Sequence, residues 1–506
     1  MQCGHHPICP GCPLLDLSYE EQLERKRERL ARALSWYSHL PAPPAVIPSA
    51  HTEGYRHRLK LPVHIQGEEV AVGLYHPRTR RVLHTPDCPV LEPRLRSALQ
   101  RMIPWLRGRD GIHSIDLRLS RASRELQVVL ACRGGDLPGG ARAARALIRQ
   151  VPELRSVAVS IADSREKKVM GRQPRVLAGV GHLDEKIGDT RLRIHSGAFF
   201  QVDPRQAERL HQIVREMAAG ASRVIDLFSG VGAYALMLAP HCERVVAVEE
   251  NLQAVLAARA LAPANVEVLH RKVEELDLPQ DGFDVAVLNP ARKGSDPLTL
   301  ERVARTAPRL IYVSCGPESL ARDLDALASC GMRTRGMRAI DLFPQTEEVE
   351  TVALLERGPP RQRFRVEGGW ARVPWPRGWS GAEGRPLEVI LLVIGGTPAH
   401  GSWMGARFQR LATVATHSLV RIQWHRPVEP LLKALRRMGQ PVAGDDPRTA
   451  AFFFEKAGLC RPFLHVERSD RGSAPWHGDL VQALLYLGVP ATRIERWQRR
   501  DAPPGH

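Results

Sequence analysis

The sequence lacks a long hydrophobic run. Its longest apolar stretch, residues 389–394 with their neighbours, is far shorter than the roughly 20 residues that a membrane-spanning helix requires. The N-terminus also lacks the charged-then-apolar layout of a secretory signal. We therefore expect a cytoplasmic protein that does not enter the membrane. In a reducing compartment, the nine cysteines need an explanation other than disulfide bonds.

Lysine is also scarce. The 72 basic residues comprise 9 lysines and 63 arginines, and 55 acidic residues leave a formal charge of +17. The planar donor fork of arginine suits phosphate groups and base edges, so a polyanionic partner is one explanation. A GC-rich genome, which favours arginine, is the other, and composition leaves both open. The 43% hydrophobic content is typical of a folded protein, and 506 residues predict two to four domains.

Four cysteines have the spacing of a metal site. Cys3, Cys9 and Cys12 form a tight group in a segment rich in Gly, Pro and His, and Cys88 follows in a second such segment. A Cys-x-x-Cys pair lets one turn present two thiolates to one centre, while a remote cysteine ties a second segment to it. The spacing predicts a metal but does not distinguish zinc from an iron–sulfur cluster.

A capping-box pattern, Ser18-Tyr19-Glu20-Glu21, predicts a helix that runs to about Trp36. Leu23, Leu30 and Leu34 mark its apolar side. We interpret the other side as solvated, with RNA contact as the alternative; its basic residues are Arg25, Lys26, Arg27, Arg29 and Arg32. The proline-rich residues 41–48 are expected to end this first module, and short alternating segments then predict an α+β module over residues 49–196.

Residues 224–249 have the pattern of a nucleotide-binding βαβ unit. An apolar strand over residues 224–228 is followed by the turn Ser229-Gly230-Val231-Gly232, a helix, and a second strand that ends in Glu249, 23 residues after Asp226. Glycines allow close approach of a ligand, and a carboxylate at the second strand end can bind ribose hydroxyls. The sequence contains no Gly-Lys-Ser/Thr loop, so a nucleoside triphosphate is not supported.

Further strands at residues 266–269, 285–288 and 310–314 predict a doubly wound sheet with ligands at the carboxyl ends of its strands. Cys315 follows one strand and precedes a helix start at Pro317. The helix N-terminus is expected to lower the pKa of the thiol, which makes Cys315 a candidate nucleophile.

Two glutamates form a candidate acid–base pair. Glu348 and Glu350 are two apart in a predicted strand, so we expect both on one face. Like charges at that distance raise the pKa of one carboxyl group, as a general base working near neutrality requires. Paired glutamates on a solvated surface are the alternative.

Together these elements resemble the RNA uracil-5-methyltransferase family over about residues 1–356. The motifs that carry the resemblance are the four cysteines, Phe199-Phe200-Gln201-Val202-Asp203-Pro204, the Asp226–Gly232 loop, Val248-Glu249, Tyr312-Val313-Ser314-Cys315 and Asp341-Leu342-Phe343-Pro344-Gln345-Thr346 ahead of Glu350. The resemblance implies a class I (Rossmann-like) α/β methyltransferase domain with S-adenosyl-L-methionine as cofactor. It also implies a 4Fe-4S cluster on Cys3, Cys9, Cys12 and Cys88, and RNA as partner, with 23S rRNA preferred over tRNA.

The same resemblance assigns roles to individual residues. Cys315 would add to uracil carbon 6 and Glu350 would remove the carbon-5 proton, giving 5-methyluridine. The cofactor would be held by residues from four segments: Gln201, Phe228, Gly230, Gly232, Glu249 and Asn289.

Several positions depart from the family pattern, among them Ala233, Lys272 and Ala291. Asn289 replaces the usual aspartate, and Glu348 stands where a histidine is usual. Because an amide both donates and accepts, Asn289 motivates an alternative, a cytosine-5 RNA methyltransferase. A third hypothesis is a non-catalytic RNA-binding or assembly protein.

The last part of the chain is expected to consist of a linker and an extension, in which the sequence predicts strands at residues 387–394 and 417–424 and a helix at residues 429–438. We expect a division into residues 1–48 (cysteine segment and helix), 49–196 (central α+β domain), 197–357 (methyltransferase domain), 358–386 (linker) and 387–506 (α+β extension). Residues 440–445 and 461–465 weakly resemble the closing part of a ribosomal-type pseudouridine synthase. No Arg-Leu-Asp segment that could supply its catalytic aspartate is present. We therefore expect a binding remnant, and we infer no obligate protein partner.

Overall fold

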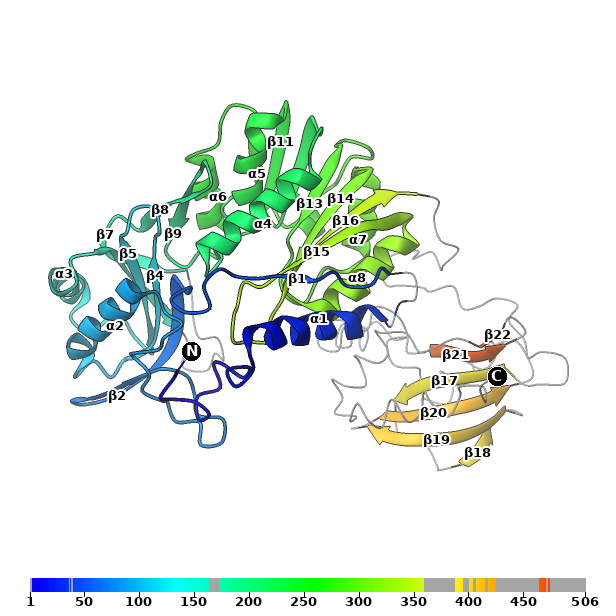
Figure 1. The fold of residues 1–506 in the computed structure, drawn as a ribbon, viewed down its shortest axis with the longest axis horizontal. Coiled ribbons are helices and arrows are strands. Elements are labelled where there is room, and N and C mark those ends of the chain that lie inside the picture. Colours follow the sequence, from blue (N-terminus) through cyan, green and yellow to red (C-terminus); the bar gives the residue numbers. More distant parts are fainter. Residues whose placement is uncertain are drawn as a thin grey trace.

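The computed structural model in Figure 1 describes residues 2–35, 37, 40–162 and 173–358. Beyond these it describes the backbone of β17 to β22, whose bounds are given below. The expected linker, the helix at residues 429–438 and most of the pseudouridine synthase resemblance lie outside the described residues. Within the described chain, no helix has both the length and the apolar character needed to cross a membrane.

The largest unit is an eight-stranded sheet in the order β1-β15-β16-β14-β13-β10-β11-β12. Its strands are β1 (Val46–Ile47), β10 (Arg223–Leu227), β11 (Arg244–Glu249), β12 (Val266–His270), β13 (Val285–Leu288), β14 (Arg309–Ser314), β15 (Met332–Ile340) and β16 (Glu350–Arg357). β10 to β14 pair in parallel, whereas β16 runs antiparallel to both β14 and β15. The predicted doubly wound sheet is therefore confirmed.

Helices cover both faces of this sheet (Figure 1). Successive strand residues point to opposite faces, so Ile225 lies in one hydrophobic cluster and Val224 in the other. The first cluster includes residues of α1 (Tyr19–Ser35), α7 (Pro297–Thr306) and α8 (Pro317–Ser329). The second includes residues of α4 (Pro204–Met217), α5 (Ala233–Leu238) and α6 (Leu252–Arg259). Short 3-10 helices follow at Ala239–His241 and Val273–Glu275.

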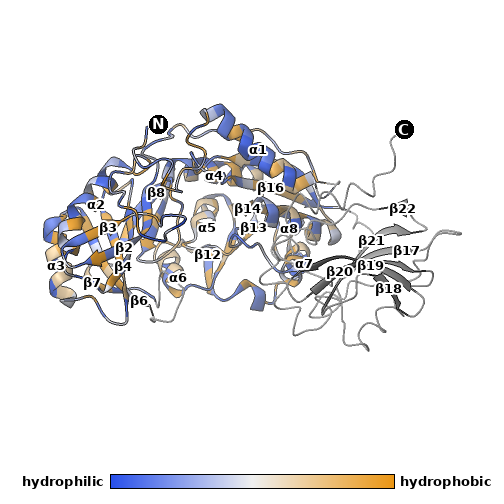
Figure 2. Cartoon of the chain, turned by 90° about the horizontal axis from the view of Figure 1, so that it is seen from below, coloured by the Kyte–Doolittle hydropathy of each residue, from blue (hydrophilic) through white to orange (hydrophobic). Residues whose placement is uncertain are grey.

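The N-terminal helix α1 confirms the capping box but corrects the expected charged face. Ser18 Oγ accepts from the Glu21 amide at 3.3 Å, and the Glu21 carboxylate accepts from the Ser18 amide at 2.8 Å. Although α1 is largely hydrophilic in Figure 2, the Lys26 side chain is fully buried and pairs with Asp341. Lys26 precedes Leu30 by four residues and Leu34 by eight, so helical geometry places it on the apolar face. The solvated-face interpretation is wrong for Lys26.

Residues 41–48 also contribute to the large sheet. They contain β1, which pairs in parallel with β15 through Val46↔Ala339 and Ile47↔Ile340. The proline-rich stretch therefore carries the chain from α1 along the edge of the sheet before the central part begins.

The central part has its own six-stranded sheet, ordered β3-β2-β4-β5-β6-β7. Its elements are β2 (Arg58–Gln66), β3 (Glu69–Val72), α2 (Pro93–Leu106), β4 (Ile112–Leu119), β5 (Leu126–Arg133), α3 (Gly140–Gln150), β6 (Leu154–Ala162) and β7 (Arg175–Gly179). Leu99 of α2 and Leu147 of α3 are fully buried in one cluster with Leu117 of β4. The hairpin β8 (His182–Ile187) and β9 (Thr190–His195) then leads to the large sheet. The central part thus combines helices with a mostly antiparallel sheet.

The described strands of the C-terminal part form a six-stranded sheet in the order β18-β19-β20-β17-β21-β22. They are β17 (Leu387–Ile394), β18 (His400–Trp403), β19 (Ala406–Val414), β20 (His417–Trp424), β21 (Leu464–Ser469) and β22 (Gly472–Ser473). The two strands predicted there, at residues 387–394 and 417–424, are confirmed.

Candidate active site at the carboxyl edge of the large sheet

The topology of the large sheet brings the predicted site residues to one edge. β10, β11, β13 and β14 are parallel neighbours, so Glu249, Asn289 and Cys315 all lie at or just beyond their carboxyl ends. β16 runs the opposite way, and its register pairs Ser314 with Thr351. Glu350, the first residue of β16, is therefore at the same edge. This is the edge where doubly wound sheets bind ligands.

The glycine turn after β10 leaves room for a ligand. Phe228, Gly230 and Gly232 all have positive φ angles, of 59°, 55° and 76°. A Cβ on Gly230 would meet nothing within 4 Å, whereas one on Gly232 would lie 3.0 Å from Ala258 Cβ. Gly232 is thus needed for packing, and Gly230 lies beside open space that a cofactor can fill.

The carboxylate of Glu249 is held in a fixed orientation. It accepts from the Gly230 amide at 2.9 Å and from the Asn251 amide at 2.7 Å, one bond to each oxygen. Because a carboxylate oxygen can accept more than one hydrogen bond, both oxygens remain able to bind hydroxyl groups. This geometry suits the ribose contact predicted for Glu249.

Asp226 is a second carboxylate at this site, noted in the sequence only as part of the loop motif. It is fully buried, and Oδ2 accepts from the Ala235 amide at 3.0 Å. Oδ1 has no hydrogen-bond partner within the described residues. Burial, and then the charge of Glu249, raise the pKa of Asp226 to about 7. An unpartnered buried oxygen beside the glycine turn is a candidate contact for a polar cofactor group.

The segment that carries Gln201 is held in place by a residue of the central sheet. Gln201 is half-buried and lies between buried Phe200 and Asp203, which caps α4 by accepting from the Arg205 amide at 2.9 Å. The buried guanidinium of Arg118 on β4 donates to Ala198 O at 3.1 Å and lies 5.7 Å from the centre of the Phe200 ring. Sequence reasoning missed Arg118, because an arginine in an alternating strand is expected to face solvent.

Cys315 lies between β14 and α8, as predicted, but its pKa differs from the prediction. The Gly316 amide donates to Ser314 Oγ at 3.1 Å and tightens the turn around the thiol. Burial, and then the charge of Glu350, raise the pKa of Cys315 to about 11, whereas Arg292 lowers it. The expected lowered pKa is therefore wrong, because desolvation outweighs the positive end of α8.

Glu348 and Glu350 occupy different environments, which corrects the expectation that both point from one strand face. Glu348 precedes β16, and its side chain is 32% exposed and paired with Arg292. Glu350 is 3% exposed, and burial, followed by the charge of Glu348, raises its pKa to about 8. The raised carboxyl pKa is confirmed, with burial as its main cause.

The loop that begins at Asn289 is held in place by a buried network that the sequence did not predict. The Asn289 amide donates to Leu227 O at 3.3 Å, which fixes the loop to β10. Farther along, the Ser295 amide donates to Asp323 Oδ2 at 2.8 Å, and the Tyr312 hydroxyl donates to the same oxygen. Tyr312 belongs to the predicted Tyr312–Cys315 motif, but its fully buried partner, Asp323, lies on α8.

The four N-terminal cysteines line one cavity, well removed in sequence from Cys315. The cavity measures about 90 Å³ and is lined by Cys3, Cys9, Cys12 and Cys88 together with Tyr55 and other residues. Burial, and then the charges of the other three thiols, raise the pKa of Cys12 to about 12. In the part of the chain that the structure describes, however, no three His, Cys, Asp or Glu side chains form a group that could hold a metal ion. The four thiols therefore share one cavity, but among the described residues they are not arranged as a metal-binding group.

The doubly wound sheet, the open glycine turn and the oriented acid at the end of β11 are typical of a Rossmann-like domain that binds a nucleoside-bearing cofactor. The profile of the tRNA (uracil-5-)-methyltransferase family matches residues 18–270 and 264–358. The chain belongs to this family, which makes it an S-adenosylmethionine-dependent RNA methyltransferase.

Relatives and solved structures agree with this assignment. An uncharacterized RNA methyltransferase of Thermosynechococcus vestitus is 33% identical over 369 residues, which cover 69% of this chain and 82% of the relative. One of Nostoc sp. is 31% identical over 371 residues, covering 69% and 80%. The crystal structure of Pyrococcus abyssi tRNA (uracil-54, C5)-methyltransferase in complex with S-adenosyl-L-homocysteine is similar with a TM-score of 0.57 and 27% identity. That similarity covers 69% of this chain and 86% of the other.

Proposed function

We propose that this protein forms 5-methyluridine in 23S rRNA, with Cys315 as nucleophile and Glu350 as general base. The observation that carries the proposal is the convergence of a thiol, a buried carboxyl group and an open glycine turn at one sheet edge. The charge of Glu350 acts on the Cys315 thiol, and the charges of Glu350 and Asp226 both act on Tyr234. These interactions link the thiol, the carboxyl group and the helix that follows the glycine turn, which supports their action in one reaction.

S-adenosylmethionine supplies an electrophilic methyl group when bound. The residues that would hold it fit such a ligand: Gly230 beside open space, Glu249 with two oriented oxygens, and Asp226 with one unpartnered oxygen. Gln201 and Phe228 would complete the cofactor site, and Asn289 would lie between the cofactor and the target base. Gly232 would act by allowing α5 to pack closely.

The proposed reaction requires two actions by the protein. The Cys315 thiolate adds to uracil carbon 6, and the electron pair of the carbon 5–carbon 6 double bond moves toward carbonyl oxygen 4 as an enolate. After carbon 5 has accepted the methyl group, Glu350 takes its proton, the double bond re-forms and Cys315 leaves as a thiolate. Arg292 is the charged group that favours the thiolate.

The preference for rRNA is supported by the cysteine set, which in the resemblance accompanies action on 23S rRNA. The Pyrococcus abyssi protein, in contrast, acts on a tRNA uracil according to its name. Nucleoside mass spectrometry of rRNA and tRNA from a strain that lacks the protein distinguishes the two. We expect the loss of one 5-methyluridine from 23S rRNA, restored by the wild-type chain but not by Cys315→Ala. An unchanged modification profile in both RNAs contradicts the proposal.

We further propose that Cys3, Cys9, Cys12 and Cys88 hold a 4Fe-4S cluster, which joins the N-terminal segment to the central domain. The thiols line one cavity, and their mutual charges disfavour the thiolate form that a cationic centre would stabilise. Iron and sulfide analysis after anaerobic purification should find about four of each per chain. Zinc without sulfide, or neither metal, contradicts the cluster but leaves the methyltransferase reaction intact.

The amide side chain of Asn289 favours a second candidate function, the methylation of cytosine at carbon 5. An amide presents both a donor and an acceptor, so it can pair with the edge of either pyrimidine. Purified enzyme should methylate uridine and not cytidine in otherwise identical RNA. The reverse preference supports the cytosine reaction. A non-catalytic RNA-binding or assembly role predicts methylation of neither base.

The C-terminal residues 387–506 are proposed to be a pseudouridine-synthase-like remnant that binds RNA without catalysis. The proposal is supported by the weak resemblance of residues 440–445 and 461–465, and the described strands of this part form an antiparallel sheet. The chain shortened to residues 1–358 should retain methylation of short RNA fragments but bind full-length rRNA less tightly. Equal binding by both chains contradicts the remnant's role.

A further inference from the structure

The turn before Glu350 is held in a strained conformation by residues that lie outside the large sheet. Residues 341–346 connect β15 to the segment that enters β16, and Ile340 and Glu350 are paired across the two strands. Gln345 is buried and has a φ of 70°, in the left-handed region that disfavours residues other than glycine. Such a conformation persists only where its surroundings fix it.

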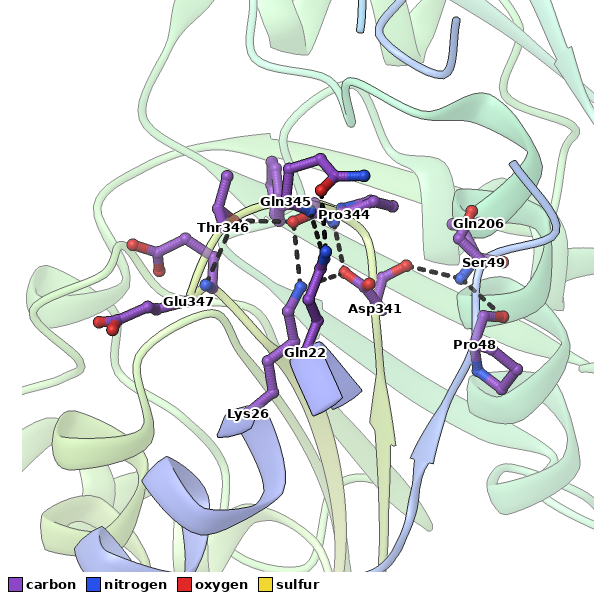
Figure 3. A network of polar contacts seen from close by, with 12 residues as sticks. Gln22, Lys26, Pro48, Ser49, Gln206, Asp341, Pro344, Gln345, Thr346 and Glu347 are labelled. Atoms are coloured by element: carbon purple, nitrogen blue, oxygen red, sulfur yellow. Dashed lines mark hydrogen bonds and ion pairs between the residues drawn. The ribbon is translucent and has the colours of Figure 1, made fainter. Parts of the chain in front are cut away.

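One clamp on this turn is the side chain of Gln22 in α1 (Figure 3). Its Nε2 donates to Gln345 Oε1 at 2.8 Å, and its Oε1 accepts from the Gln345 amide at 2.9 Å. The two bonds fix both the side chain and the backbone of the strained residue. A buried amide that is satisfied in this reciprocal way tolerates little displacement of either partner.

Lys26 forms a second clamp, one helical turn farther along. Its ammonium lies 2.5 Å from Asp341 Oδ1 and donates to Phe343 O at 3.0 Å, and both charged side chains are fully buried. Asp341 Oδ2 accepts from the Tyr19 hydroxyl at 3.0 Å, so α1 contacts the turn at three points. Gln206 of α4 donates to Asp341 O at 2.7 Å and thereby joins the turn to the helix that follows Gln201.

The same turn is tied to the cysteine cavity. The Leu14 amide, two residues after Cys12, donates to Gln345 O at 3.1 Å. Tyr55, which lines the cavity, donates from its hydroxyl to Pro344 O at 2.9 Å. Adjacent carbonyls of the strained turn are therefore bonded to the two segments that frame the cavity.

We refer to the contacts of Gln22, Lys26 and Tyr55 with residues 341–346 as the clamp. We propose that these three side chains are positioning residues for Glu350, and that the cysteine cavity acts on catalysis through the clamp. The inference rests on the proposed role of Glu350. The clamp keeps the turn strained and the Glu350 carboxyl group buried at the start of β16. A change in the cavity is transmitted through Leu14 and Tyr55 to the turn, and from the turn to the base.

The first test compares Gln22→Ala with Gln150→Ala, which removes a single side-chain bond from an exposed position on α3. We expect Gln22→Ala to lower kcat by about ten- to a hundredfold, because a small displacement of a catalytic group is costly, with KM for S-adenosylmethionine unchanged. The pH at half-maximal rate should also fall, because a looser turn hydrates Glu350. The groups that face Glu350 (Glu348, Cys315 and Tyr234) are the same in both variants. An unchanged kcat and pH profile overturns the proposal.

The strain provides a rescue experiment. In the Gln22→Ala background, Gln345→Gly removes the steric cost of the positive φ, so the turn can keep its shape without the clamp. We expect the double variant to recover several-fold in kcat and to regain the wild-type pH profile. A further loss of activity in the double variant contradicts the role of turn conformation.

Tyr55→Phe tests the link to the cysteine cavity without altering a cysteine. It should lower kcat about two- to tenfold and shift the pH profile in the same direction as Gln22→Ala, with iron and sulfide content unchanged. Tyr75→Phe, a half-exposed tyrosine outside the clamp, should do neither. Wild-type behaviour of Tyr55→Phe overturns the proposed role of Tyr55.

Hydrogen–deuterium exchange separates failure of the clamp from failure of the proposed reaction. Amides of residues 341–350 should exchange faster in Gln22→Ala and Tyr55→Phe than in the wild type, whether or not the RNA is methylated. Faster exchange in a protein that methylates no RNA refutes the function alone. Unchanged exchange in an active enzyme refutes the clamp alone.

Discussion

The sheet edge and the N-terminal cavity both surround buried thiols, yet the neighbours of those thiols differ. Cys315 lies near a cation, Arg292, which favours its thiolate, and near Glu350, a carboxyl group whose pKa is about 8. Cys12 lies near three further thiols, whose charges disfavour its thiolate more than the charge of Arg56 favours it. A thiol between a cation and a base is suited to reversible addition, whereas a group of four thiols is suited to binding a cation. Neighbours, rather than burial, distinguish the two regions.

The different roles proposed for the two regions are tested most directly by removing one thiol from each. Cys315→Ala should reduce methylation by at least about 10³-fold, because no other group can form the covalent intermediate. Cys12→Ala should cause a smaller loss, together with a lower unfolding temperature and loss of iron. Single-turnover methylation and thermal unfolding measure both effects. Comparable losses of activity with unchanged stability in both variants contradict the division of roles.

Glu350→Gln should have the next largest effect and should separate the two proposed chemical steps. The amide cannot accept the carbon-5 proton, so turnover should fall by about 10²- to 10⁴-fold. Cys315 can still add to the base, and a covalent protein–RNA adduct that carries the new methyl group should accumulate. A denaturing gel with radiolabelled RNA detects it. Glu347→Gln, at an exposed neighbouring position, is the control and should leave turnover unchanged.

The site residues could be predicted because parallel strands place their carboxyl ends together. The positions of Glu249, Asn289 and Cys315 therefore followed from strand boundaries alone. The burial of Lys26 could not be predicted with the same certainty, because helical periodicity gives its face but not its partner, Asp341, which is 315 residues away in sequence. The pKa of Cys315 was missed for a related reason. A helix N-terminus can be located in a sequence, but desolvation depends on packing from the whole domain.

A pH profile provides a smaller test of the same comparison. Glu350 acts as a base only when deprotonated, and its pKa is raised to about 8. Where removal of the carbon-5 proton limits the rate, turnover should therefore rise about tenfold from pH 7 to pH 9 and then level as Glu350 becomes fully deprotonated. Adduct formation with 5-fluorouridine RNA needs the Cys315 thiolate but not the base, so it should continue to rise toward the pKa of Cys315, about 11. Identical profiles for both measurements would show that one group limits both steps.

The smallest predicted effect concerns Glu348, whose charge raises the pKa of both Cys315 and Glu350 and which pairs with Arg292. Glu348→Gln removes that charge and frees Arg292 to act on the thiol. Both changes lower the pKa of Cys315, so alkylation by iodoacetamide at pH 8 should be about three- to tenfold faster. In protein from which iron has been removed, alkylation of Cys12, whose raised pKa has no such carboxylate among its causes, should keep its wild-type rate. A parallel acceleration at both cysteines would indicate general loosening of the fold, and no acceleration at Cys315 would mean that Glu348 does not control the ionisation of the nucleophile.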